Sequence, residues 1–258
     1  MSADVDLVVA GAGGGLVAAL RAAQHNFDVL VVEVSKSFRR GNNTSMSTSM
    51  IPGVDTRWQR ELGIEDSPDT FVADVRAKTR GTGDLRLART LAEVSGPLVE
   101  WLADDIGLPL GLMTDTWYPG HSVHRCHTVE GRHGSHLIDH LVARVRAHPR
   151  IDVLVPVRLV DVVVDDTGAV RAAVIEHQNG AREDISTSAV LLATNGFGAD
   201  PQLLAEHLPE VTGFTYHGSE HSRGDALRIG GRLGADRAFL DSYQGHGALV
   251  PRQATLGR

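Results

Sequence analysis

The stretch VVAGAGGGLVAAL (Val8–Leu20) constrains the fold more than any other part of the chain. An apolar run leads into four glycines, and an alanine- and leucine-rich segment follows directly. The run predicts a buried strand over 6–10, and the segment predicts a helix over 15–24. A further apolar run that ends in an acid predicts a second strand over 27–33. The order strand, helix, strand indicates a βαβ unit.

The glycine turn has the chemistry of a dinucleotide-binding site. The pattern G-x-G-x-x-G uses glycine for a tight bend, for close approach of the backbone to a pyrophosphate, and for close packing of helix on strand. Gly11 and Gly13 supply the first two, but the third position of the pattern is Leu16. We interpret the turn as one residue short, so that Gly15 takes the packing role. The helix N-terminus then presents N–H groups to the pyrophosphate. The predicted cofactor-binding residues of the turn are Gly11, Gly13, Gly14 and Gly15.

Glu33 strengthens this interpretation because it ends the next strand, 20 residues after Gly13. An acid at that position accepts hydrogen bonds from the ribose hydroxyls of adenosine. It would also repel a 2′-phosphate, which disfavours NADP as the ligand. A glycine-rich turn without any ligand is the alternative.

The composition argues against some classes of partner. A net charge of −7 disfavours nucleic acid, since neutralising phosphates needs a basic face. No apolar run approaches the roughly 18 residues that a membrane-spanning helix needs, and the start MSADVDLVV lacks the basic region of a signal peptide. The only cysteine, Cys126, fits a reducing compartment. We therefore expect a cytoplasmic protein that binds neither nucleic acid nor a membrane.

The rest of the chain shows helical and strand patterns in turn. Leu, Ala and Val spaced by three and four predict helices between about 68 and 102 and again over 135–147. Residues 151–194 hold Val- and Ile-rich runs separated by turn signals, which predict a β-meander that returns into a last buried strand. The polar stretch SFRRGNNTSMSTSMIPG and the histidine-rich residues 107–134 predict loops.

The polar stretch also carries a resemblance. RRGNNTSMSTSMIPG resembles the second phosphate-binding segment of the fumarate reductase and succinate dehydrogenase flavoprotein family, whose pattern is close to GGNTAMSTGGIP. Small hydroxyl and amide side chains leave backbone N–H groups open to a pyrophosphate and a ribityl chain, whereas bulky side chains would block them. A polar surface loop is the alternative. The residues that match the pattern, and to which the resemblance assigns cofactor contacts, are Gly41, Asn43, Thr44, Ser47 and Thr48.

Three later stretches resemble cofactor-binding segments of the same family. VRLVDVVVDDTGAV is similar to the strand whose backbone grips the adenine, which places Leu159 at the contact. VLLATNGFG is similar to the ATGGFG turn at the flavin phosphates, which implies contacts at Thr194 and Gly196. HSRGDALRIGGRLGA places Asp225 where the family has a cofactor-contacting aspartate.

Two further stretches resemble the substrate side of the family's site. YPGHSVHRCHT followed by GRHGSHLI is similar to its Arg/His segment, which implies that Arg125 and His127 bind a substrate carboxylate. SYQGHGALV is similar to a Q-x-H-P segment, in which His246 matches a histidine near substrate and flavin and is the predicted catalytic residue.

The resemblance implies an α/β fold: a Rossmann-like FAD-binding domain over 1–204, with a parallel sheet and a β-meander insertion, and the beginning of a substrate-capping domain over 205–258. It implies FAD as cofactor and hydride transfer between flavin and a C–C bond of a small molecule, a carboxylic acid or a ketone. It names no partner subunit. Family members continue into a fuller cap with a proton-shuttling arginine and then a further glycine-rich segment. These 258 residues hold neither, so we expect a truncated chain.

Other functions stay open. A catalytically silent module that binds FAD or ADP would share the same turn, and so would an NAD-dependent enzyme, although the latter has no need of the segment 41–49. Zinc would need three or four converging ligands, and no cysteine or acid completes either histidine set, so we predict no metal site. The two sets are His121, His124 and His127, and His133, His136 and His140.

Overall fold

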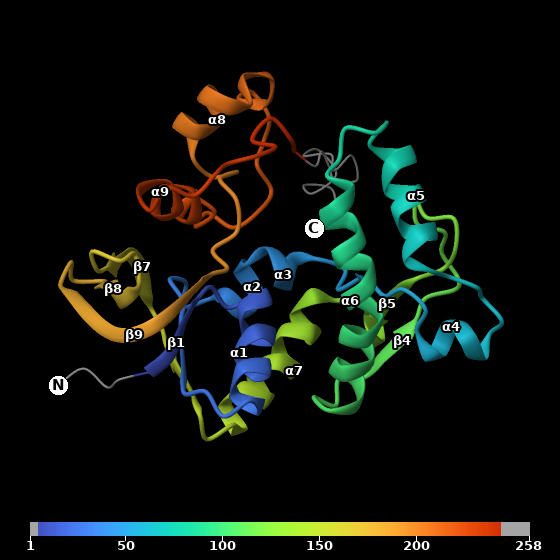
Figure 1. The fold of residues 1–258 in the computed structure, drawn as a ribbon, viewed down its shortest axis with the longest axis horizontal. Helices are drawn as coiled ribbons and strands as arrows, with labels where there is room; N and C mark the ends of the chain where they lie inside the picture. The colour runs from blue at the N-terminus through green and yellow to red at the C-terminus, as the bar shows by residue number, and fades with distance from the viewer. Residues whose placement is uncertain (1–4, 244–258) are drawn as a thin grey trace, which may run out of the picture. The chain divides into compact units, whose positions relative to one another are not determined.

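The computed structural model describes residues 5–243, which form two compact units divided after Ala193. The first unit (Figure 1) is built on a six-stranded sheet, in which the strand order is β6-β2-β1-β9-β8-β7. In chain order its strands are β1 (Val5–Ala10), β2 (Val29–Val32), β6 (Ile151–Leu154), β7 (Val157–Val164), β8 (Val170–His177) and β9 (Arg182–Leu192).

The centre of this sheet is parallel. Strand β1 lies between β2 and β9, so that Val8 faces both Leu30 and Val190 in register. Strand β2 also pairs in parallel with β6, while β7, β8 and β9 pair antiparallel. This confirms the α/β class with a mainly parallel sheet and a β-meander. One detail differs: β6 stands outside the meander, because the helical crossover that follows β2 returns the chain beside β2.

Two helices provide most of the core against the sheet. Helix α1 (Gly14–Gln24) and helix α7 (Gly134–Ala147) contact each other (Figure 1). Each buries residues spaced by three and four. These include Leu16, Leu20, Ile138 and Leu141, each at most 3% exposed. Both helices agree with the sequence-based expectation to within one residue at their starts. The glycine turn joins the end of β1 to the start of α1. The two helices therefore hold it at the edge of the sheet formed by the carboxyl ends of the parallel strands.

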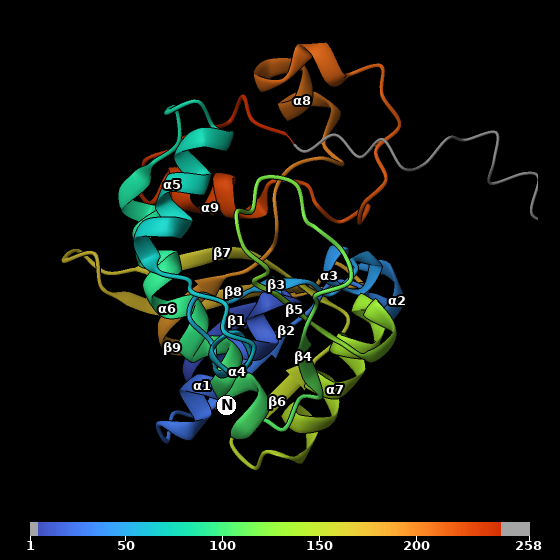
Figure 2. The same cartoon turned by 90° about the vertical axis from the view of Figure 1, so that its right-hand side faces the viewer.

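A second, three-stranded antiparallel sheet has the order β3-β5-β4 (Figure 2). Its strands are β3 (Ile51–Pro52), β4 (Leu110–Leu112) and β5 (Cys126–Val129), and the 3₁₀ turn η1 (Glu130–Arg132) follows β5. The expectation of a loop throughout 107–134 is therefore wrong. Each strand is too short for a period to show in the sequence, and β5 is buried at all four positions because of tertiary packing.

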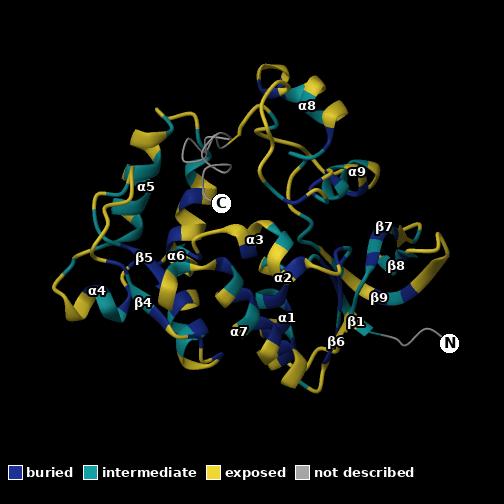
Figure 3. Cartoon of the chain, turned by 180° about the vertical axis from the view of Figure 1, so that it is seen from behind, coloured by how far each residue is buried: buried dark blue, intermediate teal, exposed yellow. Residues whose placement is uncertain are grey.

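Helices α4 (Arg57–Glu61), α5 (Pro68–Lys78) and α6 (Leu85–Asp104) complete the first unit together with two single-turn helices. Helix α5 is capped by the Ser67 side chain and buries no residue fully, whereas α6 carries a buried stripe (Figure 3). The single-turn helices α2 (Phe38–Gly41) and α3 (Asn43–Met46) replace the loop predicted for this stretch.

The second unit contains α8 (Pro201–His207), the 3₁₀ turn η2 (Pro209–Val211) and α9 (Asp225–Arg232). Asp200 caps α8 through the backbone N–H groups of Gln202 and Leu203, and it also pairs with Arg228 of α9. The division into functional domains at residue 204 stays a prediction. Within residues 5–243, no helix is both long and apolar enough to cross a bilayer.

Candidate functional site

The glycine turn has the backbone geometry that its sequence indicates. Gly11 has a φ of 108°, a conformation that side chains rarely adopt, and Gly13 is the residue before α1. A Cβ atom added to Gly15 would lie 2.7 Å from Cγ1 of Val9 in β1. Helix and strand therefore approach most closely at Gly15, which is what the interpretation of a shortened turn requires. Leu16, the residue at the usual third position, instead packs in the core.

Glu33 lies against this turn. Its side chain is 6% exposed, with Oε2 accepting from the Ala12 N–H at 2.8 Å and Oε1 accepting from the Ser35 N–H at 2.8 Å. The carboxylate therefore faces the turn and fixes its backbone. Its predicted contact with a ribose stays a prediction.

The segment 42–49 lies next to the same turn. Asn42 donates from Nδ2 to the carbonyl of Ala12 at 3.0 Å, and a Cβ atom on Gly13 would stand 2.7 Å from Oγ1 of Thr44. Two segments separated by about 30 residues are thus in contact.

Asn42 is the residue that sequence reasoning missed. Its Oδ1 accepts from the Ser45 N–H at 2.7 Å, and its own N–H donates to Ser45 Oγ at 3.2 Å. This capping box starts α3 and explains why a helical turn stands where a loop was predicted. The signal was present in the sequence as N-x-x-S, at two of the positions that depart from the flavoprotein pattern.

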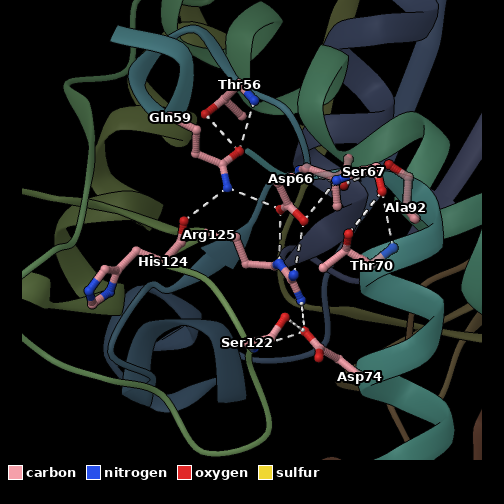
Figure 4. Close-up of polar contacts among 12 residues, drawn as sticks. Thr56, Gln59, Asp66, Ser67, Thr70, Asp74, Ala92, Ser122, His124 and Arg125 are labelled. Carbon is pink, nitrogen blue, oxygen red and sulfur yellow. Dashed lines mark hydrogen bonds and ion pairs between the residues drawn. The ribbon is translucent and has the colours of Figure 1, made fainter. Parts of the chain in front are cut away.

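Arg125 lies in a buried ionic network (Figure 4). The side chain is 1% exposed; Nε and Nη2 donate to the two carboxylate oxygens of Asp66, each at 3.0 Å, and Nη1 donates to Asp74 at 2.7 Å. Asp74 also accepts from the N–H and the hydroxyl of Ser122. Burial raises the pKa of Asp74, but the hydrogen bonds from Ser122 and Arg125 outweigh burial and leave that pKa below its usual value.

His127 is fully buried beside this network. Its Nε2 lies 2.9 Å from Oγ1 of Thr56, and its Nδ1 lies 3.0 Å from the carbonyl of Arg125. Gln59 joins the two parts: its Oε1 accepts from the Thr56 N–H and its Nε2 donates to Asp66 (Figure 4). Burial lowers the pKa of His127 to about 4, against the effect of its backbone hydrogen bonds. At neutral pH the ring is uncharged.

The structure therefore gives both predicted substrate-binding side chains partners within the protein. Arg125 meets two carboxylates, so the group as a whole carries a net negative charge. A substrate carboxylate would have to replace Asp66 or Asp74 to gain a guanidinium partner. The role of Arg125 and His127 in substrate binding stays a prediction.

The other predicted cofactor residues lie in several elements. Leu159 is buried in β7 opposite Ile175. In the second unit, the carbonyl of Gly196 accepts from the Gly224 N–H at 3.0 Å, and Asp225 is the first residue of α9. Oγ1 of Thr194 is closed off from solvent and has no hydrogen-bond partner among the described residues. His246 lies outside the described residues.

The histidine sets do not gather into a ligand cluster. His133 and His136 contact each other edge to face, with ring centroids 5.1 Å apart. Across residues 5–243 there is no group of three or more His, Cys, Asp or Glu side chains that could hold a metal ion.

Known proteins share the sequence pattern and the fold of this chain. The chain is 31% identical to fumarate reductase 1 of Saccharomyces cerevisiae over 249 residues, which is 93% of this chain and 52% of that protein. Its structure is similar to a flavocytochrome c3 fumarate reductase in an open conformation, with a TM-score of 0.81, 28% identity, and coverage of 90% of this chain and 41% of that one.

It is also similar to the 3-ketosteroid-Δ4-(5α)-dehydrogenase of Rhodococcus jostii RHA1, with a TM-score of 0.77 and 26% identity, covering 93% of this chain and 56% of that one. The chain thus spans about half the length of these relatives, or less. A family model described as an FAD binding domain matches residues 6–256. The chain therefore belongs to this FAD binding domain family, whose cofactor is FAD.

Proposed function

We propose that this chain is the FAD-binding part of a flavin-dependent oxidoreductase that acts on a C–C bond next to a carboxylate or ketone group of a small molecule. The observation that carries the proposal is the contact between the glycine turn and the segment 42–49, with Glu33 held against the same turn. The similarity to two fumarate reductases and a ketosteroid dehydrogenase supports the reaction class.

The residues of the first unit fit the adenosine diphosphate part of FAD. The N–H groups at the start of α1 point out of an 11-residue helix, whose dipole favours an anion at that end. Because Gly13 has no side chain, the hydroxyl of Thr44 can lie against the turn, which is where the proposal has the pyrophosphate bind. In this proposal the Glu33 carboxylate, which already accepts from the Ala12 and Ser35 N–H groups, also accepts from the ribose hydroxyls.

When bound, FAD supplies hydride transfer to or from the substrate. The chain's own residues hold and orient the cofactor. In this proposal His246, Arg125 and His127 keep their predicted roles at the substrate, and the small-molecule substrate is an unsaturated or saturated acid or ketone. We also propose a cytoplasmic location, which the single buried thiol, Cys126, supports.

The proposal is tested by titrating the purified, ligand-free chain with FAD and with NAD⁺, following flavin fluorescence and competition. We expect FAD to bind at least about tenfold more tightly than NAD⁺, a difference of about 1.4 kcal/mol. Glu33→Gln should weaken FAD binding, because an amide cannot accept from two N–H groups and the ribose as a carboxylate does. Glu65→Gln, at an exposed position, is the matched control. Equal affinity for NAD⁺ would contradict the proposal.

Reaction class is tested separately. The FAD-loaded chain is reduced with dithionite without oxygen, and fumarate or 4-androstene-3,17-dione is then added while the flavin absorbance is followed. Reoxidation by either compound supports the oxidoreductase proposal. Binding of FAD without reoxidation by any unsaturated acid or ketone supports the alternative, a module that binds FAD or ADP without catalysis.

A further inference from the structure

Two residues outside the predicted cofactor contacts, Gly134 and Thr128, lie directly behind the segment 42–49. Gly134 is the first residue of α7, and its N–H donates to the carbonyl of Ser47 at 2.8 Å. A Cβ atom added there would stand 1.8 Å from the carbonyl oxygen of Thr44 and 2.9 Å from that of Ser47. Both are backbone atoms, so they cannot rotate away. Only glycine allows α7 to begin this close to the segment.

Thr128 of β5 holds the end of the segment. Its Oγ1 lies 2.7 Å from Oγ of Ser49 and 3.2 Å from the carbonyl of Thr48. Ser49 and Thr128 are 3% and 9% exposed, so water replaces these bonds poorly. Either hydroxyl can donate in the Ser49–Thr128 bond, and the single proton of Thr128 can instead go to the carbonyl of Thr48 or, at 3.3 Å, to that of Val129.

The opposite side of the segment faces the glycine turn. Asn42 holds the Ala12 carbonyl, and Thr44 lies against Gly13. The segment 42–49 is thus held between two parts of the fold. The glycine turn lies on one side, and the start of α7 and the end of β5 lie on the other. A loop fixed in this way loses little further conformational entropy when it binds a ligand.

We propose that Gly134 and Thr128 are positioning residues for FAD: without touching the cofactor, they set the backbone of 42–49 in the conformation that binds it. This inference rests on the proposed function. It extends the cofactor site to helix α7 and to strand β5 of the three-stranded sheet. None of the predicted cofactor contacts lies in either element.

The first test compares Thr128→Val with Thr128→Ser in the whole chain. Valine keeps the shape but removes the hydroxyl, so Ser49 and Thr48 lose their partner. We expect FAD affinity to fall about tenfold, mainly through faster release. Serine restores the hydroxyl and should bring the affinity back to within about threefold of the wild type. The measurements are the FAD dissociation constant and release rate from flavin fluorescence, with the unfolding temperature of the ligand-free protein recorded beside them.

The second test compares Gly134→Ala with Gly111→Ala. A Cβ atom at Gly111 in β4 meets no atom within 4 Å, so this variant controls for the added methyl group. We expect Gly134→Ala to weaken FAD binding more than Thr128→Val does, because it moves the backbone rather than removing one hydroxyl. Gly111→Ala should bind FAD like the wild type.

The outcomes separate the two proposals. A contact that only stabilised the fold would lower the unfolding temperature and leave the FAD affinity of the folded protein unchanged. If the wild type binds FAD and Thr128→Val binds it equally well, the inference is overturned while the proposed function stands. If Gly134→Ala does not fold, the valine–serine pair still decides the question. If the wild type fails to bind FAD, the proposed function is overturned and this inference with it.

Discussion

Arg125 shows how the partners of one residue decide what it can do. The family resemblance implies that it binds a substrate carboxylate. The structure encloses the Arg125 side chain between Asp66 and Asp74. Both carboxylate oxygens of Asp66 accept hydrogen bonds from the guanidinium. Removing one member of such a buried pair leaves uncompensated charge, which costs more than the pair itself contributes.

Replacing Arg125 with methionine should therefore destabilise the ligand-free protein by about 3–5 kcal/mol, because two carboxylates lose their partner inside the fold. Urea unfolding at pH 7 measures this change. Arg86→Met is the control, since Arg86 is 88% exposed and its ion pair with Asp84 is long, at 3.9 Å. Equal stability of the Arg125 and Arg86 variants would show that Arg125 has no structural role.

His127 gives a pH dependence whose sign follows from its environment. The folded protein lowers its pKa to about 4 from an ordinary 6.5, so the unfolded chain takes up the proton first as the pH falls. The contribution of His127 to stability is complete above pH 6.5 and is lost as the pH falls towards 4.

Between pH 7 and pH 5, we expect stability to fall by about 2 kcal/mol on account of this residue. In His127→Gln the fall should be smaller by that amount, whereas His25→Gln, at an exposed position, should keep the wild-type slope. The check is a set of urea unfolding curves at half-unit pH steps. Identical slopes in all three proteins would contradict the assignment.

At the scale of elements, glycines determine how closely three helices pack against neighbouring parts of the chain. Helix α1 meets β1 at Gly15, α7 meets the segment 42–49 at Gly134, and α6 meets the chain at Val54 through Gly96. In each case a glycine in a helix allows contact with another element that any side chain would prevent. Helix propensity alone would favour alanine at all three positions.

Gly96→Ala tests this point in α6. In an exposed helix the change would stabilise by about 1 kcal/mol. Here the added Cβ would stand 2.0 Å from the carbonyl oxygen of Val54, so we expect destabilisation by about 1–3 kcal/mol instead. Gly14→Ala in α1 is the control, because its Cβ meets no atom within 4 Å. Thermal unfolding of the ligand-free proteins gives the comparison, and a more stable Gly96→Ala would refute the packing argument.

At the scale of the whole molecule, folding and cofactor binding are linked. A ligand that binds only the folded chain raises its stability by about 2.7 kcal/mol at 100 times the dissociation constant. The chain spans about half the length of the relatives compared, or less, and its glycine turn, Glu33 and segment 42–49 all lie in the first unit.

We therefore expect the unfolding temperature to rise steadily with the logarithm of FAD concentration. Riboflavin lacks the pyrophosphate and adenosine, so at equal concentration it should produce a much smaller shift, because the glycine turn and Glu33 have nothing to bind. Differential scanning fluorimetry with both compounds checks this. If riboflavin raised the unfolding temperature as much as FAD does, the binding energy would not come from the glycine turn and Glu33.

Local sequence patterns were enough to predict the βαβ unit, the glycine turn and the helices α1, α6 and α7, because each depends on residues close together in the chain. Short elements such as α2, α3 and β5 were not predicted, because a hydrophobic period cannot be recognised over four residues. Only the tertiary structure decided that Asn42 meets Ala12, that Gly134 backs the segment 42–49, and that Arg125 pairs with acids 59 and 51 residues earlier. Those contacts join distant parts of the chain, and packing rather than local preference brings them together.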